Sequence, residues 1–112
     1  MADPKRGLVV PVRLRPDRAE RMIHEIAMDT SKVIIGTHAL GRLAEREISD
    51  IELYRLLQTG HVMDQPTRTE RNEWKCKVVK QLKGNREAGA VTIILHNGKL
   101  FVKTVEWEDL RR

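Results

Sequence analysis

Apolar residues follow a helical period through the first half of the chain and an alternating period through the second. From Pro16 to about Met28 they recur every three or four positions, which predicts a helix with proline in its first turn. The same spacing predicts a helix from about His38 to Glu47. Between these helices, residues 33–35 form a short extended lead-in. The first half of the chain is therefore expected to be helical.

The clearest helix start in the sequence lies at Ser49. Ser49 and Glu52 have the spacing of a capping box, and Ile48 and Leu53 are placed to pack as a hydrophobic staple. Gly60 is a typical residue for ending a helix. These signals predict a third helix that ends at Gly60 and meets the preceding helix at a tight corner.

Beyond Gly60 the period changes to two. Trp74, Cys76 and Val78 alternate with Lys75 and Lys77, which predicts a strand over about 74–82 with one apolar face.

Two further strands, 91–95 and 100–105, flank the dipeptide Asn97-Gly98, which predicts a two-residue type I′ turn. That turn would pair Leu95 with Leu100 and Val91 with Thr104. The more apolar face, expected to meet the helices, would then hold Val91, Ile93, Leu95, Leu100, Val102 and Thr104.

The chain divides into three parts. Its 112 residues fit one compact domain. Residues 1–32 read as an N-terminal arm, a short edge strand at 10–14 and an added helix, with 1–7 as a loose tail. Residues 33–108 read as an α+β domain, and 109–112 as a tail. The fold class expected is two to three N-terminal helices packed on an antiparallel sheet.

Composition narrows the class of protein. With 40% apolar and 33% charged residues, the chain resembles ordinary soluble proteins. No apolar run exceeds three residues, the length of 33–35, which is too short to span a bilayer, so we expect no membrane partner and a cytoplasmic location in a bacterium. The single cysteine, Cys76, excludes an internal disulfide and a cysteine-based zinc site. The four histidines lack metal-ligand spacing, so no metal and no cofactor are expected.

Net charge points to an acidic or polyanionic partner. The balance is +5, from 21 Lys and Arg against 16 Asp and Glu. Lys75 and Lys77 are candidate RNA-binding residues, and Trp107 could stack on a base or instead pack against the sheet. An acidic partner protein fits this charge nearly as well as nucleic acid.

The predicted second helix carries one histidine and two arginines on a single side. His38, Arg42 and Arg46 fall within about 80° of arc, and Thr37 as N-cap would place the histidine among unpaired backbone N–H groups. This arrangement describes an anion site that contains a proton-transfer group. The alternative is a solvated helix face in which Arg42 pairs with Glu45.

These residues resemble a known family. The run His38-Ala39-x-x-Arg42-x-x-x-Arg46-x-Ile48-Ser49, the short helix ending at Gly60, and Val102-x-Thr104-Val105 are similar to the domain of unknown function 4258 family over about residues 33–107. That family is grouped with the barnase, EndoU, colicin nuclease and RelE (BECR) fold. The resemblance implies helices on a curved three- to four-stranded antiparallel sheet and a metal-independent ribonuclease, or a protein derived from one. The site residues that it implies are His38, Arg42, Arg46 and Thr104.

The chemistry implied is RNA cleavage without a metal. A neutral His38 would deprotonate the ribose 2′-OH, Arg42 and Arg46 would grip the phosphate, and Thr104 would donate a hydrogen bond to it. No general acid is identified. We therefore expect a toxin-like endoribonuclease acting on single-stranded or ribosome-associated RNA, with an antitoxin protein as partner. The alternatives are a non-catalytic RNA- or protein-binding module, and a component whose site is covered by an antitoxin or by its own N-terminal arm.

Overall fold

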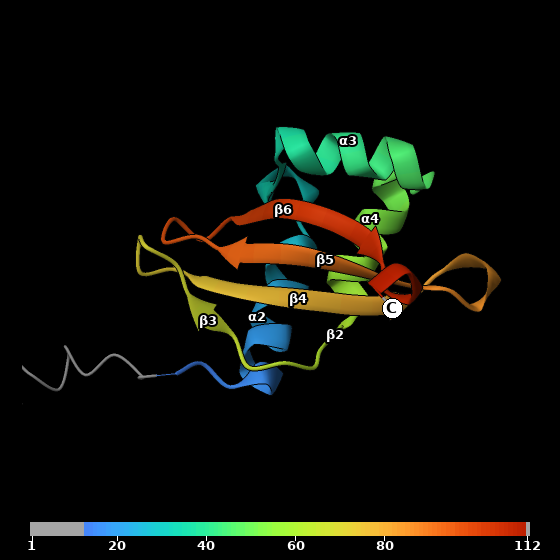
Figure 1. The fold of residues 1–112 in the computed structure, drawn as a ribbon. Helices are drawn as coiled ribbons and strands as arrows, with labels where there is room; N and C mark the ends of the chain where they lie inside the picture. The colour runs from blue at the N-terminus through green and yellow to red at the C-terminus, as the bar shows by residue number, and fades with distance from the viewer. Residues whose placement is uncertain (1–12, 112) are drawn as a thin grey trace, which may run out of the picture.

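The structure, a computed structural model, describes residues 13–111 and has the α+β architecture expected (Figure 1). The described part contains the α-helices α2 (Pro16–Ala27), α3 (Thr37–Arg46) and α4 (Asp50–Thr59). The expected tail at 1–7 and most of the expected edge strand at 10–14 lie outside the described residues. The three helices lie within two residues of their predicted bounds.

The sheet has six strands and is mixed, whereas three or four antiparallel strands were expected. Its order is β1-β6-β5-β4-β2, with β3 also pairing with β4. The strands are β1 (Val33–Ile35), β2 (His61–Val62), β3 (Thr67–Arg68), β4 (Trp74–Gln81), β5 (Glu87–Ile94) and β6 (Leu100–Trp107). The long strands β4, β5 and β6 form the antiparallel meander, and β1 joins β6 in parallel. Strands of two or three residues are too short to show a period in the sequence.

Local capping explains how the helical corner forms. The Ser49 hydroxyl accepts from the Glu52 N–H at 3.0 Å, and the Glu52 carboxylate accepts from the Ser49 N–H at 2.9 Å. Both halves of the predicted capping box are therefore present, and Gly60 is the C-cap as predicted. Before Ser49 the chain turns sharply at Glu47, whose φ of 56° is left-handed. Helices α3 and α4 consequently meet at a tight corner.

The prediction that Thr37 is the N-cap of α3 is wrong. Gly36 occupies that position, and Thr37 is the first helical residue. The Gly36 N–H donates to the carbonyl oxygen of Val102 at 3.0 Å, so the chain leaves the sheet at this point. A Cβ at Gly36 would lie 2.6 Å from the Phe101 ring. The close approach of β6 therefore requires glycine where a side-chain cap was expected.

The predicted two-residue turn is also wrong. The hairpin between β5 and β6 has a three-residue loop, His96 to Gly98, closed by Leu95 and Lys99, whose N–H and carbonyl oxygen are 2.9 Å apart. Only Gly98 in this loop has a positive φ, of 83°, whereas a type I′ turn needs two such residues. The longer loop shifts the register by one residue, so that Leu100 lies opposite Ile94.

This shift exchanges the faces of β5. A bulge between Val91 and Thr92 then restores the predicted pairing of Val91 with Thr104. The buried residues of the two strands are Ala88, Ala90, Thr92, Ile94, Leu100, Val102, Val105 and Trp107. The prediction that Thr104 faces the helices is therefore wrong, because Thr104 is half-buried on the opposite side of the sheet.

The helices leave one face of the sheet without a helical cover. Figure 1 shows α2 and α4 behind the sheet and α3 along the outer side of β6. We call the face opposite α2 and α4 the open face. Its residues on the long strands are Lys75, Lys77, Val79, Glu87, Gly89, Val91, Ile93, Phe101, Thr104 and Glu106. The apolar ones among them are half-buried, whereas the residues under the helices are buried.

Candidate functional site

Helix α3 holds the predicted anion site beside the open face. Ala39 and Leu43 are its buried residues, and α3 packs along β6. His38 and Arg42 precede these two residues by one position, about 100° around the helix. His38 and Arg42 therefore lie on a different side of α3 from its buried residues, and Figure 1 shows α3 running alongside β6 at the border of the open face.

The first turn of α3 has free hydrogen-bonding capacity. Gly36 supplies no side-chain cap, so the backbone N–H groups of the first turn receive no capping side chain. His38 is exposed in this turn. A helix N-terminus attracts anions, and an exposed imidazole beside it can exchange a proton with a bound ligand. The geometry can therefore serve both anion binding and proton transfer.

Glu45 lies between the two arginines of the site. Its Oε1 atom is 2.6 Å from Nη1 of Arg42 and 3.5 Å from Nη1 of Arg46. Arg46 is the less exposed of the two, at 22% against 36%, and its buried Nε atom has no hydrogen-bond partner. The pairing expected for a solvated helix face is present. A phosphate that binds both guanidinium groups would compete with the Glu45 carboxylate.

Thr104 does not lie where the sequence placed it. It is on the open face of β6 and not on the face that meets α2 and α4. Within residues 13–111 no hydrogen bond joins Thr104 to His38, Arg42 or Arg46. The structure therefore does not join Thr104 to the helix residues as one connected group.

The two predicted RNA-binding lysines have different surroundings. Both lie on the open face of β4, because Cys76 and Val78 point into the core as predicted. Lys77 Nζ is 2.8 Å from Oε1 of Glu108, and each side chain is 18% exposed. Lys75 instead borders a hollow at the other end of the open face. Lys77 is thus held in an ion pair, and Lys75 is available to a ligand.

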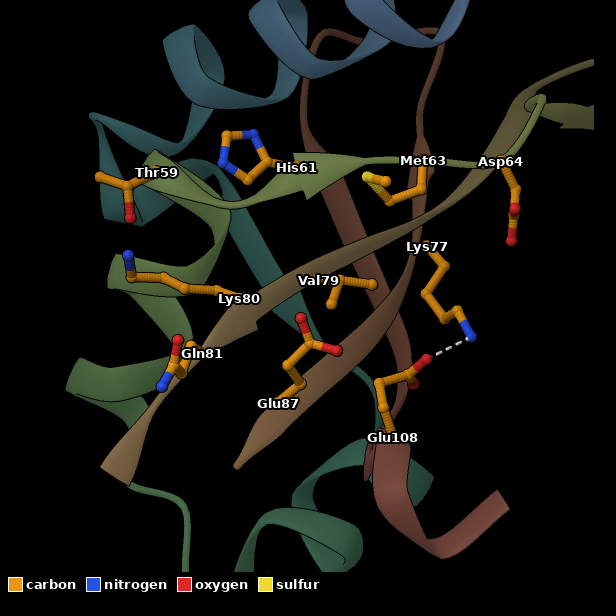
Figure 2. A pocket seen from close by; sticks show the side chains of 10 residues that line it. All are labelled: Thr59, His61, Met63, Asp64, Lys77, Val79, Lys80, Gln81, Glu87 and Glu108. Carbon is orange, nitrogen blue, oxygen red and sulfur yellow. Dashed lines mark hydrogen bonds and ion pairs between the residues drawn. The ribbon is translucent and has the colours of Figure 1, made fainter. Parts of the chain in front are cut away.

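A cavity of about 560 Å³ surrounds the paired lysine (Figure 2). Figure 2 shows His61 on β2 at one rim and Glu108, in the turn η3 (Glu108–Arg111), at the other. A Cβ at Gly89 would crowd the Glu108 carboxylate, so a side chain there would force this carboxylate to move. The sequence offered no signal for this cavity, because its two charged partners are 31 residues apart.

Trp107 has the packing role that was the alternative to base stacking. It is 4% exposed, and the Arg86 guanidinium lies 4.2 Å from the centre of its ring. Arg86 also pairs with Asp109. Buried on one side and covered by Arg86 on the other, the ring presents no face to a base.

The remaining histidines and the cysteine have structural surroundings. His24 Nε2 is 2.6 Å from the Gly60 carbonyl oxygen, which joins α2 to the end of α4. His61 lies 3.4 Å from Glu20 on α2. His96 is exposed, and its ring forms a hydrogen bond with the Arg71 carbonyl oxygen. Burial raises the pKa of Cys76 to about 12, which suits a packed thiol and not a nucleophile.

Residues 13–111 contain no cluster of three or more metal-ligating side chains. No helix among them has the length and apolar character needed to cross a membrane.

Comparison with known proteins identifies the family. The model of the family described as "Domain of unknown function (DUF4258)" matches residues 35–107, which include α3, α4 and strands β2 to β6. No curated protein and no solved structure matches the chain. The family match covers well over half of the sequence. This chain therefore belongs to the domain of unknown function 4258 family.

Proposed function

We propose that this protein is a toxin-like, metal-independent endoribonuclease of the bacterial cytoplasm, with the RelE/barnase-like (BECR) fold. It would act on single-stranded or ribosome-associated RNA and be held in check by an antitoxin protein. One observation carries the proposal: His38 is exposed in an uncapped first helical turn, one turn before Arg42, beside a sheet face that no helix covers. An imidazole, guanidinium groups and free amides are the groups that metal-free RNA cleavage uses.

The proposed reaction is attack of the ribose 2′-oxygen on the adjacent phosphorus. His38 takes the proton from the 2′-OH, and Arg42, Arg46 and the first-turn amides of α3 stabilise the charge that develops on the phosphorane. The bond from phosphorus to the 5′-oxygen breaks, and the leaving oxygen takes a proton from water, which reaches the exposed His38 site. The products are a 2′,3′-cyclic phosphate and a 5′-hydroxyl end.

Inducible expression in a bacterial host tests this activity. The wild-type chain should arrest growth and fragment cellular RNA, and His38→Ala/Arg42→Ala should do neither. Arg55→Ala provides a matched control, because Arg55 is an exposed arginine on the neighbouring helix α4. Absence of growth arrest together with absence of RNA cleavage, with and without ribosomes, would reject the proposal.

A second candidate function is a non-catalytic module that binds RNA or a partner protein through the same surface. The observation that favours it is the 2.6 Å ion pair between Arg42 and Glu45, which occupies one of the proposed phosphate ligands. RNA binding that survives His38→Ala but is lost in Arg42→Ala, without any cleavage by the wild type, would select this candidate.

A further candidate is a component whose site is covered by an antitoxin or by its own N-terminal arm. New cleavage activity after deletion of residues 1–12, which leaves helix α2 and its buried residues in place, would support it.

A further inference from the structure

One hollow on the open face concentrates cations that lack acidic partners. It has a volume of about 500 Å³ and lies between the loop from β3 to β4 and the three long strands. Its lining residues are Arg68, Thr69, Glu70, Arg71, Glu73, Lys75, Ile93 and Lys103. We call it the basic hollow. Four of these side chains are cations and two are acids.

Three of the four cations are unpaired. Lys75, Lys103 and Arg71 form no side-chain ion pair within residues 13–111, although their Arg68 neighbour is held by Asn72 and stacks on Trp74. Lys77, Arg42, Lys83 and Arg86 each contact a carboxylate, whereas Arg21 and Arg55 are isolated exposed cations that form no ion pair within residues 13–111. The basic hollow differs from both groups because three cations without ion pairs line one cavity.

The wall of the basic hollow is fixed before any ligand arrives. The His96 ring bonds the Arg71 carbonyl oxygen at 2.9 Å, and its backbone N–H donates to the Glu73 carboxylate at 3.0 Å. The Thr69 hydroxyl also accepts from the N–H groups of Arg71 and Glu73. These bonds tie the loop between β3 and β4 to the hairpin between β5 and β6. A site that is already ordered loses less entropy when it binds.

We propose that the basic hollow binds the phosphate backbone of single-stranded RNA, as a subsite apart from the α3 site. Lys75 on β4 lies opposite Ile93 of β5, and Lys103 lies on β6 two residues beyond Phe101, the β6 partner of Ile93. Because β5 separates β4 from β6, the two lysine-bearing strands are about 10 Å apart. Two long ammonium side chains at this spacing can each contact a phosphate of one RNA strand, while Ile93 supplies an apolar floor. This inference deepens the proposed function, since it takes RNA as the ligand.

An acidic protein fits the basic hollow less well than RNA. Protein interfaces are anchored by large apolar or aromatic side chains in buried pockets. The large apolar side chains that are exposed, Met28, Ile34, Leu40, Ile51 and Met63, all lie outside the basic hollow. Backbone phosphates need only cations and therefore favour RNA as the occupant.

The test measures binding of a 2′-O-methyl RNA 12-mer, which the proposed chemistry cannot cleave, by fluorescence anisotropy over a range of KCl concentrations. Lys75→Gln/Lys103→Gln should weaken binding about tenfold at 0.1 M salt and reduce the salt slope by about 1.4, which corresponds to two phosphate contacts. Lys32→Gln/Arg55→Gln removes the same charge from exposed residues elsewhere and should change affinity less than twofold.

Equal losses in the two double variants would overturn the subsite, because net charge alone would then explain binding. Competition by a glutamate 12-mer as strong as that by RNA would overturn the assignment to RNA. If the wild-type chain binds the 12-mer through Lys75 and Lys103 but never cleaves RNA, the proposed activity is rejected and the proposed subsite is retained.

Discussion

The two ends of the open face differ in how their charges are used. At one end Lys77 and Glu108 form an ion pair over Gly89, and η3 is held down further by Arg86 and Asp109. At the other end Lys75 and Lys103 carry similar charge without carboxylate partners. At the Lys77 end the cations hold the C-terminal turn η3 to the sheet through ion pairs. At the Lys75 end the cations remain available to solvent or to a ligand.

This difference shows why charge in the sequence is a poor guide to binding. Lys75 and Lys77 are two positions apart on one strand and share one face. What separates their roles is which distant segment packs above each: η3 above Lys77, and only the edge of a loop beside Lys75. Lys77 is therefore a structural residue, and Lys75 is a candidate RNA-binding residue.

The largest effect should come from breaking the pair at Lys77. Lys77→Met removes the ammonium that Glu108 contacts at 2.8 Å on a largely buried surface and should lower the free energy of unfolding by about 2 kcal/mol. Urea denaturation measures this, with Lys75→Met as the control, expected to stay within about 0.5 kcal/mol of wild type. Equal losses of unfolding free energy in Lys77→Met and Lys75→Met would show that the two ends of the open face do not differ in this respect.

A smaller effect is expected in alkaline solution from Cys76, which lies between the two lysines on the covered side of β4. Burial raises the pKa of its thiol from 9.0 to about 12. The folded chain therefore binds this proton more tightly than the unfolded chain. The stability it contributes is complete below about pH 9 and is lost as pH rises toward 12, at about 1.4 kcal/mol per pH unit.

Cys76→Val isolates this contribution, because it removes the titrating group with little change in volume. The difference in unfolding free energy between wild type and variant should be constant from pH 7 to 8.5 and shift in favour of the variant above pH 9. A difference independent of pH up to 10.5 would show that the covered side of the sheet is open to solvent.

Structural features that depend on residues close in the sequence could be predicted, and features that depend on residues far apart in the sequence could not. The capping box at Ser49 and the alternation along β4 are local signals, and both predictions are confirmed. The hairpin loop was predicted one residue too short because Asn97-Gly98 suits a two-residue turn. The bulge, in which Lys103 is the extra residue of β6 opposite Val91 and Thr92, leaves no mark in the sequence. The predicted direction of Thr104 was wrong because neither feature was foreseen.

The candidate site follows the same rule. His38, Arg42 and Arg46 share one helix, so their common side could be predicted from helical spacing, as could the pairing of Arg42 with Glu45. The ion pair between Lys77 and Glu108 and the basic hollow could not be predicted from the sequence, because they join segments that only the folded sheet brings together.

Gly89→Ala tests how strongly the ion pair between Lys77 and Glu108 holds η3 to the sheet. The added Cβ would lie 2.4 Å from a Glu108 carboxylate oxygen, so the side chain must move away and weaken its contact with Lys77. We expect a loss of about 1 kcal/mol in unfolding free energy. Gly41→Ala is the matched control, since nothing lies within 4 Å of its Cβ and alanine favours the helix, giving a gain of about 0.5 kcal/mol. An unfolding free energy that is unchanged in Gly89→Ala would show that the ion pair does not hold η3.

The smallest effect should come from Glu45→Gln, which makes the α3 site resemble the unpaired end. Without the carboxylate, Arg42 and Arg46 lose their shared partner and should hold inorganic phosphate or the RNA 12-mer two- to fivefold more tightly. Titration followed by anisotropy measures the change, and Glu47→Gln in the exposed corner after α3 is the control. Weaker binding in Glu45→Gln would mean that the arginines serve the helix and not a ligand.

Metal-independent RNA cleavage by the α3 site, as proposed, is tested by end-group analysis of RNA incubated with the purified protein in excess EDTA. We expect fragments with 2′,3′-cyclic phosphate and 5′-hydroxyl ends, formed by wild type and by Arg55→Ala but not by His38→Ala. Fragments formed equally by His38→Ala, or only when a divalent metal is added, would contradict it.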